Sequence, residues 1–496
     1  MTGAAWTVII AIRLFVGGAV GMGDQGDARR LLCQLGVRAT TPFNASTSSY
    51  LYPTWRAHRW FGEACSADGA GGVFRSSQLW LLSMAKHLTP VLGLPGALDL
   101  RAQGALCALI VGLVVGALVV FVPGPVWLRV TIASLVGLLA ADSAVAQFFI
   151  SPYSEPLELL GTLALCPALL ALWRRGHTTW PTLAAVGFLA TVVIGAKTQA
   201  AALLPAVMVA VLWLPHGRSD QSHEEGRFTV AGWPRLTARM RWLAARVPGM
   251  VLCALLLGTT AYLVVTGPVG LTRQDVYAEV FGEILPHSTD PAADLRSLGA
   301  DPSLADAAGT NPESPKAATL RPEYLKFRDD VTLLNIVTFY VTHPLRLLPT
   351  GADGLKGMAR WRQDYLGSYL PGSGKPPGAI ENRVGVYGGI FRNAWPPVLV
   401  VVWGATLYVG IATARNGRLV TGERALGGLA AFVAAGSFLE FWAVMISVGF
   451  PDVYRHMVLA NMLLALGIPA MAACLVVRVN SIKRRASMEH TAVSPA

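Results

Sequence analysis

Four short stretches of this chain carry ionisable side chains beside long apolar segments. They are "GMGDQGDARR" with Asp24 and Asp27, "SPYSEPLE" with Tyr153 and Glu155, "GAKTQA" with Lys197 and Gln199, and "PDVYRHMVLAN" with Asp452, Arg455 and His456. Carboxylates suit general-base chemistry, because an attacking hydroxyl needs a proton acceptor within hydrogen-bond distance. Cations at a helix start suit a phosphate, which Lys, Arg and backbone N–H groups bind. These residue types favour group transfer from a lipid-phosphate donor.

The composition indicates which kind of protein must position these groups. Apolar residues make up 53% and charged residues 14% of the 496 positions, and the mean hydropathy is positive. A soluble protein of this length needs more charge to cover its surface. Several apolar runs reach about 18 residues, the length that crosses a bilayer core. We therefore predict an all-α polytopic membrane protein.

About ten transmembrane helices are predicted from these runs. They lie near residues 4–22, 104–122, 125–141, 156–173, 180–196, 199–215, 247–268, 396–413, 426–447 and 454–477. The third, fifth and sixth are short or closely coupled, which leaves nine or eleven open. The first is expected to remain as an anchor, because it lacks the basic flank and the cleavage site of a secretory signal.

Lys and Arg in the short loops set the predicted orientation. They are concentrated in "WRRGHT", the 216–246 loop, "ARNGRLVTGER" and the tail "RVNSIKRR", while the short loops between these hold almost none beyond Lys197 and Arg455. Because cytoplasmic loops carry the excess of Lys and Arg, both termini are predicted to be cytoplasmic in the plasma membrane. The same bias explains much of the net charge of +11, so no nucleic-acid partner is expected.

Two long segments are then predicted to be extracytoplasmic. The first external loop, 23–103, belongs to an N-terminal transmembrane module over 1–268; the second external segment is 269–395, and transmembrane helices with a basic tail follow over 396–496. The stretches "SQLWLLSMAKHLTPVLGL" and "LLNIVTFYVTHPLRLLP" are interrupted apolar runs, typical of helices at the membrane interface. The Pro-, Ala- and Asp-rich stretch from "PHSTDPAADL" to "AATLRP" is predicted to be a mobile loop.

Each polar stretch also has an ordinary structural explanation. The two aspartates after the first span suit a solvated helix end, Glu155 suits the first turn of a helix, Lys197 suits a snorkelling position, and Asp452 suits a helix N-cap. The four stretches nevertheless share one predicted outer face, and ionisable groups near spans favour a functional site. A transporter would place such groups near the bilayer midplane, so an enzyme is favoured over a transporter or flippase, and over a non-catalytic assembly or sensor protein.

These residues resemble a known family. An acidic pair after the first transmembrane helix, in a large external loop, resembles the GT-C superfamily of integral-membrane glycosyltransferases. "YSEP" is similar to a Tyr-Ser/Thr-Glu element of its mannosyltransferase-like branches, and "DVYRHMVLAN" resembles an Arg/Lys-His helix start in bacterial members. The resemblance implies a membrane glycosyltransferase of the cell envelope. It would move a hexosyl or pentosyl group from a polyprenyl-phosphate donor to a glycan or lipid acceptor on the extracytoplasmic side.

The resemblance also implies roles for the residues. Asp24 is the first candidate for the catalytic base and Asp27 the second. Lys197, Arg455 and His456 are candidates for binding the donor phosphate, and Tyr153, Glu155, Gln199 and Asp452 for shaping the site. The spacing Asp-Gln-Gly-Asp departs from the commonest pattern, in which the acids are adjacent or one apart. Which acid is the base, and whether a divalent cation binds as cofactor, are left open, as are the sugar and the linkage.

The cysteines predict one disulfide. Cys107, Cys166, Cys253 and Cys474 fall inside predicted spans, whereas Cys33 and Cys65 share the first external loop. An extracytoplasmic location permits oxidation, and a pair in one loop is what a bridge requires. We therefore predict a Cys33–Cys65 disulfide.

Overall fold

The computed structural model describes most of the chain. The described residues are 1–23, 28–39, 56–59, 74–174, 176, 179–213, 246–361, 367–369, 373–376, 378–449 and 453–493.

Each of the ten predicted spans forms a helix. The helices of the bundle are α1 (Thr2–Phe15), α5 (Leu100–Phe121), α6 (Val126–Ala141), α8 (Glu155–Arg174), α9 (Trp180–Ala196), α10 (Leu204–Leu212) preceded by η3 (Thr198–Leu203), α12 (Val247–Val265), α19 (Pro396–Ala414), α20 (Thr421–Ser447) and α22 (Val458–Val493). Among the described residues, six helices are long and apolar enough to cross a membrane: α5, α8, α12, α19, α20 and α22.

The other four predicted spans form helices that are shorter or bent, so the total number of membrane spans stays a prediction. Helix α6 continues, after a 55° bend, into α7 (Ser143–Ala146) and η2 (Gln147–Ile150), and the bent pair would make a seventh span. Helices α1, α9 and η3–α10 are apolar but shorter than a full span. The chain is therefore a polytopic helical membrane protein.

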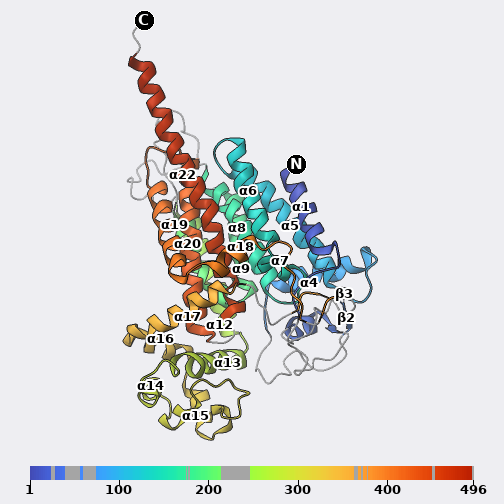
Figure 1. Ribbon diagram of the computed structural model, residues 1–496, viewed down its shortest axis with the longest axis vertical. Coiled ribbons are helices and arrows are strands. Elements are labelled where there is room, and N and C mark those ends of the chain that lie inside the picture. The colour runs from blue at the N-terminus through green and yellow to red at the C-terminus, as the bar shows by residue number, and fades with distance from the viewer. Residues whose placement is uncertain are drawn as a thin grey trace, which may run out of the picture.

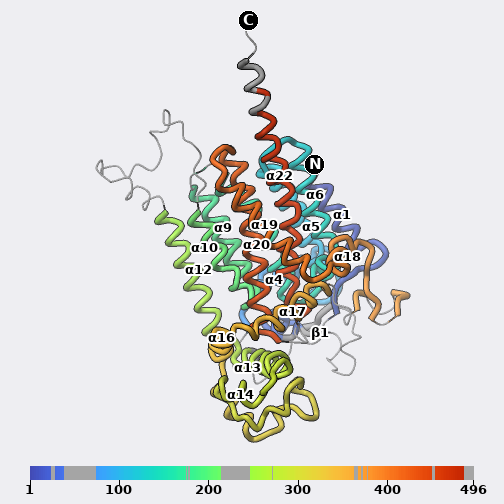
Figure 2. Tube along the Cα trace, turned by 60° about the vertical axis from the view of Figure 1, so that its left-hand side comes forward, coloured from blue at the N-terminus to red at the C-terminus, as the bar shows by residue number. Residues whose placement is uncertain are grey.

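The N-terminus and the end of α22 lie at one end of the bundle, and most of the two predicted external segments lies at the other, while residues 386–393 pack beside the bundle (Figure 1). Helices α13 (Val269–Glu279) to α16 (Leu333–Thr342), and a small sheet of the first predicted external segment, share that lower end, and the turned view shows the same separation (Figure 2). This arrangement matches the predicted grouping of loops on two sides. Which side faces the cytoplasm remains a prediction from the positive charges.

Glycines allow helices of the bundle to pack closely. A Cβ atom at Gly427 of α20 would lie 2.3 Å from the backbone N of Ala414 on α19, and one at Gly112 of α5 would lie 1.8 Å from Oγ1 of Thr7 on α1. Small residues at helix contacts let backbones approach in a membrane, where apolar side chains gain little by leaving lipid. These contacts join α1 to α5 and α19 to α20.

The first external segment contains a small sheet that the all-α prediction did not include. After α2 (Arg29–Leu32) and η1 (Cys33–Leu35), strands β1 (Val37–Ala39), β2 (Arg56–Arg59) and β3 (Leu98–Asp99) pair antiparallel in that order. Their register aligns Arg38 with His58 and Ala57 with Leu98. The sheet is too short to be read from alternation of apolar residues.

Cys33 is disulfide-bonded. The other four cysteines that the structure describes are free and buried, as predicted for thiols inside spans. The predicted partner, Cys65, lies outside the described residues, so the pairing itself stays a prediction.

The first part of the second external segment folds around a hydrophobic core of its own, whereas Tyr387 near the end of the segment is buried in the core of the bundle. The elements of the segment are α13 (Val269–Glu279), the π-helical turn η4 (Val280–Ile284), α14 (Pro291–Ser297), η5 (Pro302–Ala307), η6 (Ala318–Leu320), α15 (Glu323–Asp330), α16 (Leu333–Thr342), η7 (Pro344–Arg346), α17 (Leu347–Ala359) and α18 (Val386–Asn393). Tyr277, Phe281, Leu295 and Leu304 are buried in this core, apart from the core of the bundle. We call residues 269–359 the external module.

The Pro-, Ala- and Asp-rich stretch is not the irregular loop that its composition predicted. Asp290 caps α14 and Asp301 caps η5, each by accepting a backbone N–H bond, and Pro291 and Pro302 occupy the first position of these helices. Asp before Pro is a helix-start signal, because the carboxylate satisfies an orphan N–H and proline lacks one at a position where none is needed. The composition predicts a mobile loop where the sequence encodes short capped helices.

Both predicted interfacial stretches are helical. They form α4 (Gln78–Val91) and α16 with the following η7 and α17. Trp80 and Met84 of α4, and Leu334 and Val341 of α16, are large apolar side chains that are more than half exposed. Such rows suit contact with lipid.

A buried ion pair ties α1 to the end of the second external segment. Nη2 of Arg13 contacts Oε2 of Glu381, and both side chains are almost completely buried. Arg383 bonds the other carboxylate oxygen of Glu381 at 2.9 Å and the backbone oxygen of Arg13 at 2.8 Å. The arginine that interrupts the first apolar run therefore fastens α1 to the segment before α18.

Candidate functional site

The candidate site begins at the N-terminal end of α8. This helix starts at Glu155, with Pro156 in its first turn. The position suits both residues. An acid there complements the positive end of the helix dipole, and proline there costs no hydrogen bond because an N–H in the first turn has no partner within the helix. Glu155 is buried, and its Oε1 accepts a bond of 3.0 Å from Nζ of Lys197. Two of the predicted site residues thus form one ion pair.

The turn that carries Lys197 is held in place by the residues before α4. The hydroxyl of Ser76 donates to the carbonyl of Ala196 at 2.6 Å, and the backbone N–H of Ser77 donates to that of Gly195 at 2.8 Å. Gln78 reaches the other side of the site, since its Oε1 accepts from the N–H of Leu157 at 3.0 Å. The polar start of a predicted interfacial helix therefore fixes both Lys197 and the first turn of α8.

Helix α21 (Val453–His456) brings the third group of residues. The guanidinium of Arg455 lies 5.2 Å from the ring centroid of Tyr153, within the range of a cation–π contact. Nδ1 of His456 lies 2.6 Å from Oε1 of Gln199, and because a carbonyl-type oxygen only accepts, this imidazole nitrogen is the donor. Three segments far apart in the sequence thus meet as predicted.

Tyr153 also anchors the chain next to the predicted catalytic acids. Its hydroxyl donates to the carbonyl of Gly23 at 2.9 Å, and the N–H of Gly23 donates to the carbonyl of Gly367 at 3.0 Å. Gly23 directly precedes Asp24 in the sequence. Asp24, Asp27 and Asp452 lie outside the described residues, so their predicted roles stay predictions.

The sequence analysis missed two carboxylates beneath this cluster. Glu158 lies in the first turn of α8 and Glu440 on α20, and both are about 1% exposed. Lys197 interacts electrostatically with both of them as well as with Glu155. Lys197 is thus the cation of a buried acidic group, and its contact with a donor phosphate stays a prediction. Glu158 stands in the quoted "SPYSEPLE", but its packing against α20 has no signal in the sequence.

The arrangement is electrostatically suited to binding an anion, which would compete with the carboxylate of Glu155 for the nearby cations. Lys197, Arg455 and His456 all interact with the carboxylate of Glu155. A phosphate at this point would find a flexible point charge in Lys197 and a planar donor group in Arg455. The site lies where α8, the Lys197 turn and α21 meet, on the end of the bundle that also carries the external segments.

Comparison with known families covers nearly the whole chain. The model of the YfdI N-terminal transmembrane domain matches residues 4–492. The chain belongs to this family. The match spans the helices of the bundle, the external module and all the candidate site residues. No curated protein and no solved structure matches the chain.

Proposed function

We propose that this chain is a membrane glycosyltransferase that moves a sugar from a polyprenyl-phosphate donor to a glycan or lipid acceptor on the extracytoplasmic side of the plasma membrane. The observation that carries the proposal is the meeting of Lys197, Arg455 and His456 around Glu155, beside the backbone that leads to Asp24. A phosphate leaving group needs such cations, and an attacking hydroxyl needs a nearby base.

The proposed step uses these groups in turn. The acceptor hydroxyl passes its proton to Asp24 or Asp27 and forms a bond to the anomeric carbon. The bond from that carbon to the phosphate oxygen breaks, and the phosphate leaves with the electron pair. Arg455 and His456 stabilise its charge, and Lys197 shifts from Glu155 toward the phosphate, since the two anions compete for one ammonium group.

A transporter for a lipid-linked glycan is the second candidate, and the buried Glu158 and Glu440 favour it, because intramembrane carboxylates are common in proton-coupled transport. Their depth favours the enzyme. Glu158 is in the first turn of α8, and Glu440 lies about 10 Å from the outer end of the 27-residue α20, at 1.5 Å per residue. Both belong to the outer part of the bundle, whereas transport sites lie near the midplane.

The direct test is transfer of radiolabelled sugar from polyprenyl-phosphate donors by the purified protein in lipid vesicles. Asp24→Asn and Asp27→Asn are compared with Asp330→Asn, an exposed aspartate at the end of α15. Loss of the base should lower the rate about 10²-fold or more, and the control should transfer as wild type does.

Two outcomes would contradict the proposal. Full activity in both Asp24→Asn and Asp27→Asn would show that the assignment of the base to these carboxylates is wrong. Movement of an intact lipid-linked glycan across the bilayer, without transfer to any acceptor, would establish the transporter instead.

A further inference from the structure

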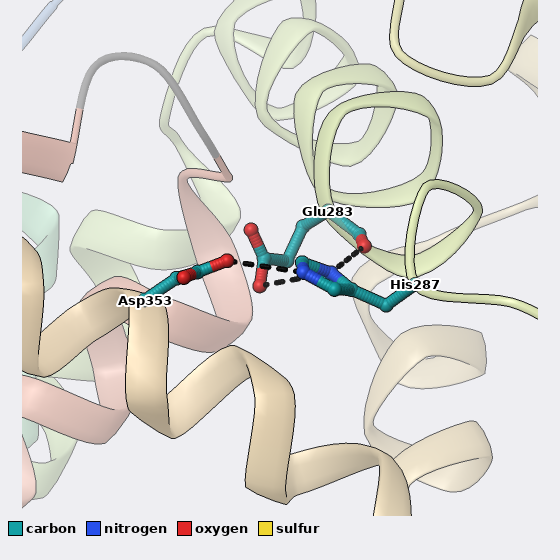
Figure 3. A group of neighbouring side chains, drawn as sticks. All are labelled: Glu283, His287 and Asp353. Carbon is teal, nitrogen blue, oxygen red and sulfur yellow. Dashed lines mark hydrogen bonds and ion pairs between the residues drawn. The ribbon is translucent and has the colours of Figure 1, made fainter.

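A second group of ionisable side chains lies in the external module, apart from the candidate site. Glu283 is on the π-helical turn η4, His287 follows one turn later, and Asp353 is on α17. Figure 3 shows the three side chains pointing toward one another from the two elements. One ligand atom of each lies within 4.8 Å of the other two.

The hydrogen bonds of His287 show that positive charge is needed between it and Asp353. Nδ1 lies 2.9 Å from the backbone carbonyl oxygen of Glu283. A carbonyl oxygen only accepts, so Nδ1 carries a proton, and a neutral ring then has a lone pair on Nε2. Nε2 lies 3.0 Å from Oδ2 of Asp353. A lone pair and a carboxylate oxygen repel at this distance unless a proton or a metal ion lies between them.

Glu283 supplies the second, independent observation. Its side chain is 1% exposed, and its Oε1 is buried without a hydrogen-bond partner. This oxygen lies 3.7 Å from Nδ1 of His287, on the side of the cluster. A buried carboxylate oxygen without a partner costs free energy, and an ion is one of the usual reasons for such a group in a native protein.

We propose that Glu283, His287 and Asp353 bind a divalent transition-metal ion of the Zn²⁺ or Mn²⁺ class. One imidazole and two carboxylates are ligands that these ions accept, whereas Ca²⁺ and Mg²⁺ prefer oxygen alone. Ligand atoms about 2.1 Å from a metal lie roughly 3–4 Å apart, so closing the present cluster needs side-chain shifts of under about 1 Å. The bond from Nδ1 to the Glu283 carbonyl would orient the ring, as outer-shell bonds of ligating histidines do.

The other carboxylate oxygen of Asp353 is compatible with this site. Its Oδ1 accepts from Nζ of Lys356 at 2.5 Å, and the Lys356 side chain is 68% exposed. This leaves Oδ2 for the metal, and it reduces the net negative charge of the cluster. The metal would therefore join the segment that carries Glu283 and His287 to α17.

The ion would also steady the helix next to the candidate site. Helix α17 packs on α21, where a Cβ at Gly357 would lie 2.9 Å from Cγ1 of Val453 and Nη1 of Arg360 donates to the hydroxyl of Tyr454 at 3.1 Å. Helix α21 presents Arg455 and His456. The metal site goes beyond the proposed function and does not depend on it, because its binding is measured without any transfer reaction.

The test measures metal binding by the full chain, purified in detergent without a polyhistidine tag. The protein is stripped with EDTA, dialysed against micromolar ZnCl₂ or MnCl₂, and analysed for bound metal by mass spectrometry. We expect one equivalent per chain for wild type and for the control Asp330→Asn. We expect an affinity about 10²-fold lower for His287→Gln and for Asp353→Asn.

An X-ray absorption spectrum of the Zn-loaded wild type makes the test independent of how the variants fold. One imidazole nitrogen and additional oxygen ligands in the zinc shell are expected. Retention of no metal by wild type would overturn the proposal and leave a protonated His287 paired with Asp353. A zinc shell without imidazole, or unchanged binding in both ligand variants, would overturn it as well.

Discussion

Replacing Glu381 by glutamine should lower the free energy of unfolding by about 3–5 kcal/mol, because it leaves the Arg13 guanidinium buried without its counter-charge. The Arg13 side chain is 4% exposed and that of Glu381 is not exposed at all. Nε and Nη1 of Arg13 have no hydrogen-bond partner, so Nη2 makes the compensating contacts, to Glu381 and to the hydroxyl of Ser143 at 3.2 Å.

The reverse replacement should cost less. In Arg13→Met the carboxylate of Glu381 keeps the backbone N–H of Arg383 at 2.5 Å and its Nε at 2.9 Å as donors to Oε1, and the hydroxyl of Ser143 lies 3.0 Å from Oε2. The loss should therefore be about 1–3 kcal/mol, the cost of one charged hydrogen-bond partner. The double variant should be more stable than the sum of the single losses predicts, by about 1 kcal/mol or more, because it no longer buries an unpaired cation.

Denaturant unfolding in detergent, followed by tryptophan fluorescence, measures these differences. The matched control is the exposed pair of Arg321 and Asp306, whose side chains are 30% and 66% exposed. Asp306→Asn should cost under about 1 kcal/mol, as is usual for surface ion pairs. If Glu381→Gln costs no more than this control, or if the two single losses simply add in the double variant, the buried pair does not hold α1 as inferred.

Three further predictions concern the site and the external module. Tyr153→Phe keeps the ring beside Arg455 but removes the hydrogen bond to Gly23. The free energy of unfolding should therefore fall by about 1–2 kcal/mol, and sugar transfer should slow. Wild-type values for both would show that this bond does not position the loop. Gly449→Ala should destabilise the external module by about 2 kcal/mol or more and speed its proteolysis. Gly449 has a φ of +64°, and a Cβ there would lie 2.4 Å from the Ala278 carbonyl. An unchanged rate of proteolysis would contradict this contact. Burial raises the pKa of Glu279 well above 4.5, so the folded protein holds the extra proton, and the stability from this group is present below about pH 4.5 and lost as the pH rises toward the raised pKa. Glu279→Gln should therefore match wild type near pH 4 and exceed it in unfolding midpoint near pH 8, and parallel pH profiles for the two proteins would contradict the buried carboxyl.

Some parts of the fold could be predicted from the sequence because they are set by residues that are close together in the chain. Apolar runs predicted all ten helices of the bundle, and charges in the loops predicted which loops share a side. The prediction of a mobile loop in the external module was wrong, although the helix starts there are also local signals. Asp290–Pro291 and Asp301–Pro302 are local helix-start signals, but a composition rich in Pro, Ala and Asp predicts a mobile loop. The core around Tyr277 and Phe281 has no periodic pattern that would have corrected this prediction.

For the candidate site, the sequence predicted which residues take part but not how they pair. The sequence places Tyr153, Lys197 and Arg455 near the ends of apolar runs on one predicted face, and this was enough to expect them together. It does not indicate which charge pairs with which. Lys197 was predicted to bind a phosphate, and the structure pairs it with Glu155 and sets it above Glu158 and Glu440.

The sequence by itself determined that this protein is a helical membrane protein, and it predicted which loops lie at the same end of the bundle and that ionisable groups gather at one end. Each of these follows from run length and charge, which act within about 20 residues of the chain. Only the tertiary structure decided the partners: Arg13 with Glu381, Tyr153 with Gly23, and His287 with Asp353. Such contacts act over a few ångströms between segments that folding brings together, so no local pattern specifies them.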